Sequence, residues 1–150
     1  MAVQRFLVPV DFSEHANQAL DYAISLAGKL DARLTLLHVL QSLPLGAVDM
    51  GVTIYTYIQD LEAEIMNSMN AYLERVTTAG LEGEIAVVHG VPFHEIIETA
   101  KTQQADLIIM GTHGRTGLQH VLLGSVAEKV VRLAPCPVLV VRQPAVVPAS

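Results

Sequence analysis

The sequence lacks tryptophan, has a single cysteine and has few charged or aromatic side chains. The one cysteine, Cys136, cannot form an internal disulfide, which excludes a small secreted scaffold held together by disulfides. Because Cys136 lies between two prolines and just before an apolar run, we interpret it as a small buried hydrophobic residue rather than a redox group. With aromatic residues at only 5% of the chain, the core must be built from Val, Leu, Ile and Ala, which favours aliphatic helices packed on β-branched strands.

Positive charge is also scarce. Lys and Arg number 9 against 15 Asp and Glu, for a net charge of −6, and the basic residues form no cluster. This excludes binding of nucleic acid or an anionic membrane through electrostatics. A small anionic ligand remains compatible with the sequence, because backbone N–H groups at a helix N-terminus supply positive potential locally. No apolar run approaches the ~18 residues of a membrane span and the first residues do not resemble a signal peptide, so we expect a cytoplasmic protein.

What the chain does contain is a regular alternation of strand-length apolar runs and amphipathic helical stretches. The runs expected to form strands are Arg5–Val10, Arg33–Val39, Glu84–His89, Asp106–Met110 and Val138–Val141. Such alternation calls for crossovers between parallel strands, with helices on both faces of the sheet. We therefore predict an α/β fold, a single-domain three-layer α/β/α sandwich over residues 1–142, followed by a flexible C-terminal tail over residues 143–150.

The expected helices lie between these runs. The first follows Ser13, which we predict as its N-cap. Its inward face would hold Ala16, Leu20, Ala23, Ile24, Ala27 and Leu30. A long connection, Leu40 to Tyr55, precedes the second helix and has a length typical of a functional loop or lid. The third helix begins at Pro92, and the fourth spans Ser125 to about Ala134.

The segment from Gly111 to Ser125 is rich in glycine and joins an apolar strand to a helix. Glycines let the backbone approach a ligand without a Cβ in the way, and the first N–H groups of the following helix lack partners within that helix. Together these features are typical of an anion site that needs no lysine. Two plainer interpretations stay open: the glycines form tight turns, and Ser125 with Glu128 forms a capping box that satisfies its own helix.

Asp11 follows the first expected strand. In an open parallel sheet, ligands bind beyond the carboxyl ends of the strands, where the strand order reverses, and a carboxylate there accepts hydrogen bonds from ribose hydroxyls. Aspartate is also a common turn or cap residue. Because an anion site is expected at another strand end, after Met110, the ribose interpretation is favoured.

Several catalytic patterns are missing from the sequence. It has no G-x-x-x-x-G-K-[ST], which excludes a Walker-type NTPase. It also has no G-x-G-x-x-G after the first strand and no G-x-S-x-G, which argues against a dinucleotide-binding fold and against a serine nucleophile. None of the histidines has metal-ligand spacing. We expect His38 and His89 to be hydrogen-bonded structural residues, whereas His113 either touches phosphate or faces solvent. No catalytic residue and no metal site are predicted.

The chain resembles the universal stress proteins, specifically their ATP-binding branch. The family signature, G-x2-G-x9-G-[ST], is met by Gly111, Gly114, Gly124 and Ser125, and the resemblance runs from FLVPVDFSEHANQAL through ADLIIMGTHGRTGL and LLGSVAEKVV to CPVLVV. It implies an adenine nucleotide alpha hydrolase-like fold with five parallel strands in the order 3-2-1-4-5. The strand order then reverses between the first and fourth strands, which Asp11 and Gly111 follow.

The resemblance also implies a nucleotide-binding set, in chain order Pro9, Asp11, Val39, Met110, Gly111, Gly114, Arg115, Gly124, Ser125 and Val126. Asp11 would bind ribose, and Val39 would contact adenine through its backbone in a pocket lined by Pro9 and Met110. The glycines, Ser125 and the N–H of Val126 would hold the phosphates, with Arg115 as the nearby cation. The implied ligand is ATP or another adenine nucleotide, with magnesium accompanying a triphosphate.

Family members commonly pair their last strands as homodimers, which implies contact through Val138–Val141; the alternative is contact through Val121, Leu122 and Leu123. The function implied is a stress-response regulator that changes conformation or partner when a nucleotide binds. A slow ATPase or self-phosphorylating enzyme, a sensor of AMP or a cyclic adenine nucleotide, and a nucleotide-free scaffold are the alternatives. The intact signature argues against the scaffold, and the lack of an evident base, nucleophile or arginine clamp argues against fast turnover.

Overall fold

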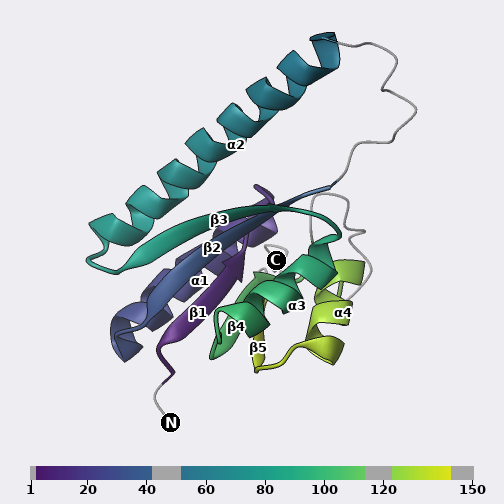
Figure 1. The fold of residues 1–150 in the computed structure, drawn as a ribbon. Coiled ribbons are helices and arrows are strands. Elements are labelled where there is room, and N and C mark those ends of the chain that lie inside the picture. The colour runs from purple at the N-terminus through teal and green to yellow at the C-terminus, as the bar shows by residue number, and fades with distance from the viewer. Residues whose placement is uncertain (1–2, 42–51, 114–122, 143–150) are drawn as a thin grey trace, which may run out of the picture.

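A computed structural model describes residues 3–41, 52–113 and 123–142 of the chain, as alternating strands and helices (Figure 1). In chain order these are β1 (Arg5–Pro9), α1 (Glu14–Leu30), β2 (Arg33–Leu40), α2 (Val52–Thr78), β3 (Gly83–His89), α3 (Pro92–Thr102), β4 (Leu107–Gly111), α4 (Ser125–Leu133) and β5 (Val138–Val141). All the strands predicted from the apolar runs are present, with ends shifted by at most one residue. Residues 143–150, predicted as a tail, lie outside the described ranges.

The strands form one five-stranded sheet in the order β3-β2-β1-β4-β5, and every pairing is parallel. The α/β fold and the predicted strand order are therefore confirmed. The central strand β1 pairs with β2 on one side, where Val8 is in register with Leu36, and with β4 on the other, where Leu7 is in register with Ile108. The chain builds outward from β1 to β3 and then returns to start β4, so the order reverses between β1 and β4.

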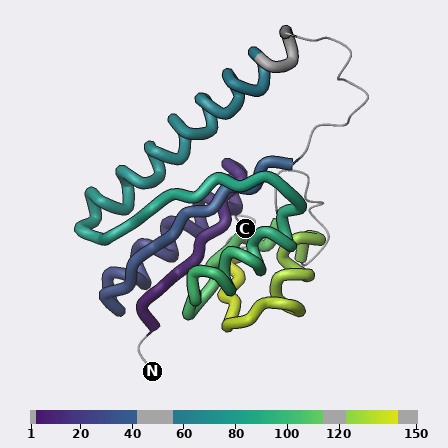
Figure 2. The backbone as a smooth tube through the Cα atoms, viewed as in Figure 1, coloured from purple at the N-terminus to yellow at the C-terminus, as the bar shows by residue number. Residues whose placement is uncertain are grey.

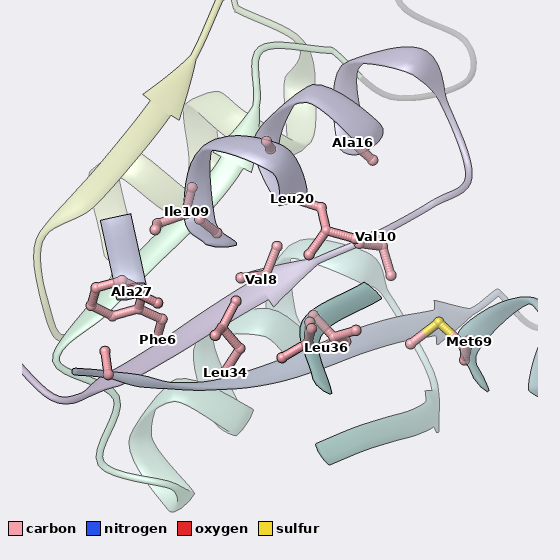
Figure 3. Close-up of a cluster of buried hydrophobic side chains, with 14 of the residues drawn as sticks. Phe6, Val8, Val10, Ala16, Leu20, Ala27, Leu34, Leu36, Met69 and Ile109 are labelled. Atoms are coloured by element: carbon pink, nitrogen blue, oxygen red, sulfur yellow. The ribbon is translucent and has the colours of Figure 1, made fainter. Parts of the chain in front are cut away.

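Helices cover both faces of the sheet, as the three-layer prediction requires. Alternate residues of β1 point to opposite faces, so Phe6 and Val8 join one buried cluster and Leu7 joins the other. The first cluster packs α1 and α2 against the sheet, and Figure 3 shows it around Phe6, Leu20 and Leu36. The second cluster packs α3 and α4 against the opposite face, where the tube in Figure 2 shows these two helices side by side.

Two expectations about the helices are wrong. Helix α2 already begins at Val52, so the last residues of the connection predicted over Leu40 to Tyr55 are helical. Leu30, expected on the inward face of α1, is 45% exposed. The chain leaves α1 at Asp31 in a left-handed conformation (φ 53°), and the next residue, Ala32, is the one buried at this end of the core.

The described helices include none that is both long enough and apolar enough to cross a bilayer. Cys136, expected as a buried hydrophobic residue, is half-buried and packs against the second cluster. Burial raises the pKa of its thiol, and the nearby Asp106 carboxylate raises it further. A raised pKa disfavours the reactive thiolate, which supports a packing role for this cysteine.

Candidate functional site

A cleft of about 970 Å³ opens at the carboxyl ends of β1, β2 and β4, at the reversal of strand order. Its floor is formed by strand-end residues, from Pro9 to Phe12 and from Met110 to His113. The first turn of α4 forms one wall, and α2 contributes Leu61 and Ile65. This is the edge at which open parallel sheets bind their ligands.

Most of the residues predicted to bind a nucleotide line this one cleft. They are Pro9, Asp11, Val39, Met110, Gly111, Gly124, Ser125 and Val126, drawn from β1, β2, β4 and α4 and from the segments that follow or precede them. The other two predicted residues, Gly114 and Arg115, lie outside the described ranges. The fold therefore brings Asp11 and Gly124, which are far apart in the sequence, to one site.

Asp11 shapes the turn from β1 into α1. Its Oδ1 accepts hydrogen bonds from the backbone N–H of Ser13 at 3.0 Å and from the Ser13 hydroxyl at 2.5 Å. The Ser13 oxygen in turn accepts from the N–H of Ala16 at 3.2 Å, which confirms Ser13 as the N-cap of α1. The turn role left open for Asp11 is therefore real. A carboxylate has about four acceptor positions, so the turn role is compatible with a further role toward a ligand in the cleft.

Phe12, between these two residues, was not singled out by the sequence. Its backbone is left-handed (φ 66°), which is uncommon for a bulky residue and is often found at functional sites. The ring lies 4.6 Å from the His38 ring and stacks on Tyr72 at 5.7 Å, centroid to centroid. His38 is buried with Nδ1 2.8 Å from the Val10 carbonyl oxygen, so its predicted structural hydrogen bond is confirmed. Phe12 and His38 both line the cleft and give it aromatic surface.

The start of α4 also lines the cleft, and here the capping-box interpretation is wrong. The N-cap is Gly124, not Ser125, because Gly124 has an extended backbone and its carbonyl accepts from Glu128 N at 3.0 Å. The Gly124 N–H is bonded to the Thr112 carbonyl at 2.7 Å. The N-cap therefore lies one residue earlier in the chain than a capping box between Ser125 and Glu128 would need. The Glu128 carboxylate lies 3.4 Å from Arg132 instead.

Helix α4 consequently begins without a side-chain cap. Its first residues, Ser125, Val126 and Ala127, all line the cleft. The first N–H groups of a helix have no intrahelical partner and carry partial positive charge. The arrangement is therefore suited to an anionic group bound in the cleft at this point.

The two described glycines of the signature are explained by close backbone approach. A Cβ on Gly111 would lie 2.8 Å from the His15 carbonyl oxygen, so glycine lets the first turn of α1 rest on β4. A Cβ on Gly124 would lie 3.2 Å from the Thr112 carbonyl oxygen. Neither has a left-handed φ, so conformational freedom is not the reason for glycine at these positions.

Two histidines meet at the end of β4. Thr112, which is 4% exposed, has its hydroxyl oxygen 3.0 Å from Nδ1 of His113 and 3.4 Å from Nδ1 of His15. The two rings lie 5.2 Å apart, and His113 lines the cleft. His89, expected as a structural histidine, is instead an exposed residue with Nε2 3.5 Å from a Glu62 oxygen. Within the described ranges no three His, Cys, Asp or Glu side chains come together as a metal site would require.

The edge strand β5 pairs with β4 on one side only, and its four residues are half-buried. This is the strand predicted to pair between two copies. Of the alternative contact residues, Leu123 packs against the second cluster and lines the cleft, while Val121 and Leu122 lie outside the described ranges.

Comparison with known proteins agrees with this architecture. A family model described as the universal stress protein family matches residues 2–142. The universal stress protein MJ0531 of Methanocaldococcus jannaschii is 34% identical over 141 residues, covering 94% of this chain and 83% of that protein. The solved structure of protein MJ0577, from the same organism, superposes with a TM-score of 0.85 at 31% identity and covers 97% of this chain and 99% of its own. A universal stress protein solved in complex with cAMP superposes with a TM-score of 0.70 at 26% identity, covering 95% of this chain and 98% of its own.

Proposed function

The chain belongs to the universal stress protein family, and we propose that it binds an adenine nucleotide, ATP foremost, in the cleft between β1 and β4. The observation that carries this proposal is the uncapped N-terminus of α4, which faces a cleft that Asp11 also lines. An anion-binding helix start and a carboxylate that line one cleft match the two polar parts of a nucleotide, its phosphates and its ribose.

The apolar part of the same cleft suits a base. Pro9, Val39 and Met110 line it, and Phe12 and His38 add aromatic surface. Adenine would lie among these side chains, with the backbone of Val39 as its hydrogen-bonding partner. The relative solved with cAMP, an adenine nucleotide, supports this choice of base.

The proposed activity is binding rather than turnover. Lys and Arg are not among the described residues that line the cleft, and fast phosphoryl transfer depends on positioned positive charge. A magnesium ion would enter as part of a metal–triphosphate complex with the phosphate oxygens as its ligands. We therefore propose a cytoplasmic regulatory protein over residues 1–142 that changes conformation or partner when its nucleotide binds, and that pairs through β5 as a homodimer.

Calorimetric titration with ATP, ADP, AMP, cAMP and adenosine tests the proposal directly. We expect saturable binding of one nucleotide per chain, with affinity that depends on the phosphates. Small molecules released from the denatured purified protein and identified by mass spectrometry would show which nucleotide it carries. If none of these compounds binds and no nucleotide is released, the proposal is wrong.

Incubation with labelled ATP and magnesium should release little phosphate and leave the protein unlabelled. Sustained turnover of many ATP molecules per minute would instead make the protein an enzyme. Sedimentation velocity at micromolar concentration should show a dimer, and a monomer at every concentration would contradict pairing through β5.

A further inference from the structure

Two imidazoles share one buried hydroxyl at the end of β4. The Thr112 oxygen lies within hydrogen-bonding distance of Nδ1 of both His15 and His113, and the Thr112 side chain is almost completely buried. The three residues come from α1 and from the segment that follows β4, so the arrangement exists only in the folded protein.

The hydroxyl fixes which ring atoms face it. A threonine hydroxyl has one proton to donate and two lone pairs that accept. It therefore either donates to one Nδ1 and accepts from the other, or accepts from both. In either arrangement both Nδ1 atoms are engaged with Thr112, so a ring that reaches a ligand must do so through Nε2.

The position of His113 shows where its Nε2 edge lies. Its Cδ2, the ring carbon bonded to Nε2, is 3.7 Å from the place that a Cβ on Gly124 would occupy. Gly124 is the N-cap of α4, so this edge of the imidazole borders the open helix start. His113 lines the cleft, whereas His15 is not among its lining residues.

We propose that His113 binds a nucleotide phosphate through Nε2 beside the first N–H groups of α4, and that Thr112 and His15 position its ring. The inference rests on the proposed nucleotide binding and names a side chain that recognises the phosphates. Imidazole N–H donates well to a phosphate oxygen, and it becomes a cation when protonated. The described part of the cleft is otherwise rich in carboxylates, with Asp11, Glu64 and Glu128. The ligand class selected is a nucleotide with its phosphates, in preference to the free nucleoside.

Paired amide substitutions separate the two ring nitrogens. In His113→Asn the amide reaches only the Nδ1 position, whereas in His113→Gln it extends to the Nε2 position. We expect His113→Asn to bind ATP about 10-fold more weakly, the effect of one lost hydrogen bond to a charged group. Adenosine affinity should be unchanged in both variants, and His113→Gln should bind ATP within about 3-fold of the wild type. Calorimetry with ATP and adenosine gives these ratios.

Thr112 provides the test of positioning. Thr112→Val keeps the shape of the buried side chain and removes the hydroxyl, so we expect ATP affinity to fall about 3-fold to 5-fold, with Thr112→Ser restoring it. In the wild-type protein, the NMR signal of His113 Nε2 should shift when ATP is added and should not shift with adenosine.

The outcomes distinguish this inference from the proposed function. If the wild-type protein binds ATP and the His113→Asn variant binds it with the same affinity, this inference is wrong and the proposed function stands. An equal loss of ATP and adenosine affinity in that variant assigns His113 a structural role and also overturns it. Wild-type protein that binds no nucleotide overturns the proposed function and this inference with it.

Discussion

Helices α1 and α4 both begin at the cleft, yet they begin in opposite ways. The start of α1 is closed by the protein's own oxygens: Ser13 accepts the Ala16 N–H, and Asp11 holds Ser13 in place. The start of α4 has Gly124 as its N-cap and no side-chain cap. Of these two helix N-termini, that of α1 has a side-chain cap and that of α4 has none.

Capping α4 artificially should have the largest effect. Gly124→Asp would place a carboxylate on the N–H groups that we assign to phosphate, and its charge would also repel the ligand. We expect ATP affinity to fall at least about 100-fold, the combined effect of lost charge-assisted hydrogen bonds and repulsion. Gly124→Ala is the matched control, because it adds the same Cβ near the Thr112 carbonyl without the carboxylate. Equal ATP affinity of the two variants in calorimetry would show that α4 does not bind the phosphates.

Pushing α1 away from β4 should destabilise the protein. The Cβ of Gly111→Ala would lie 2.8 Å from the His15 carbonyl oxygen, so the first turn of α1 must shift. We expect the free energy of unfolding to fall by about 1–3 kcal/mol, as for other overpacked sites. Gly28→Ala in the same helix is the control: its Cβ meets nothing within 4 Å, and we expect it to stabilise the helix by about 0.5–1 kcal/mol. Urea denaturation of both variants measures the difference, and a Gly111→Ala protein as stable as the wild type would contradict this account of the glycine.

At the start of α1, we expect Asp11 to bind the ribose of the nucleotide rather than its phosphates. We expect Asp11→Ala to weaken ATP binding about 10-fold, the size of one lost hydrogen bond to a charged group. The loss should be smaller for 3′-deoxy-ATP, which lacks one of the hydroxyls that the carboxylate would accept from. Calorimetry with both nucleotides measures the two losses, and equal values would reject the ribose role.

The smallest effects are expected from two serine substitutions, one at each helix start, with opposite consequences for stability and for ligand preference. Ser13→Ala removes the cap of α1 and should lower the free energy of unfolding by about 1 kcal/mol, with the preference for ATP over adenosine unchanged. Ser125→Ala lies at the start of α4, where no side-chain cap is formed. It should leave stability within about 0.5 kcal/mol of the wild type and reduce that preference. Thermal melts and calorimetry of both variants test the pair, and the opposite pattern would reverse our assignment of the two helix starts.

Much of the fold could be predicted because its signals are local and repeated. Each apolar run is long enough to identify a strand, and the alternation with helices restricts the topology to a parallel sheet. The order of the strands is implied by the resemblance to the universal stress proteins, and it places Asp11 and Gly111 at the reversal of strand order, although 100 positions separate them. The strands and helices themselves depend on periodicity, which the sequence carries in full.

The details of the site depend on contacts between distant segments. Ser125 and Glu128 match a capping box by spacing, but the helix has Gly124 as its N-cap, and the Gly124 N–H is bonded to the Thr112 carbonyl at the other end of the glycine-rich segment. Phe12, in its left-handed turn, likewise packs on His38 and on Tyr72 of α2. A local pattern contains no information about such partners.

Thr112 contacts the starts of both helices. Its carbonyl holds the N-cap of α4, and its hydroxyl lies beside His15 in the first turn of α1, so a single residue joins the two helix starts. Helix α1 is packed on the sheet along its length, with Ala19, Leu20, Ala23 and Ala27 fully buried. A displacement of Thr112 would therefore change the start of α4 and the first turn of α1 together.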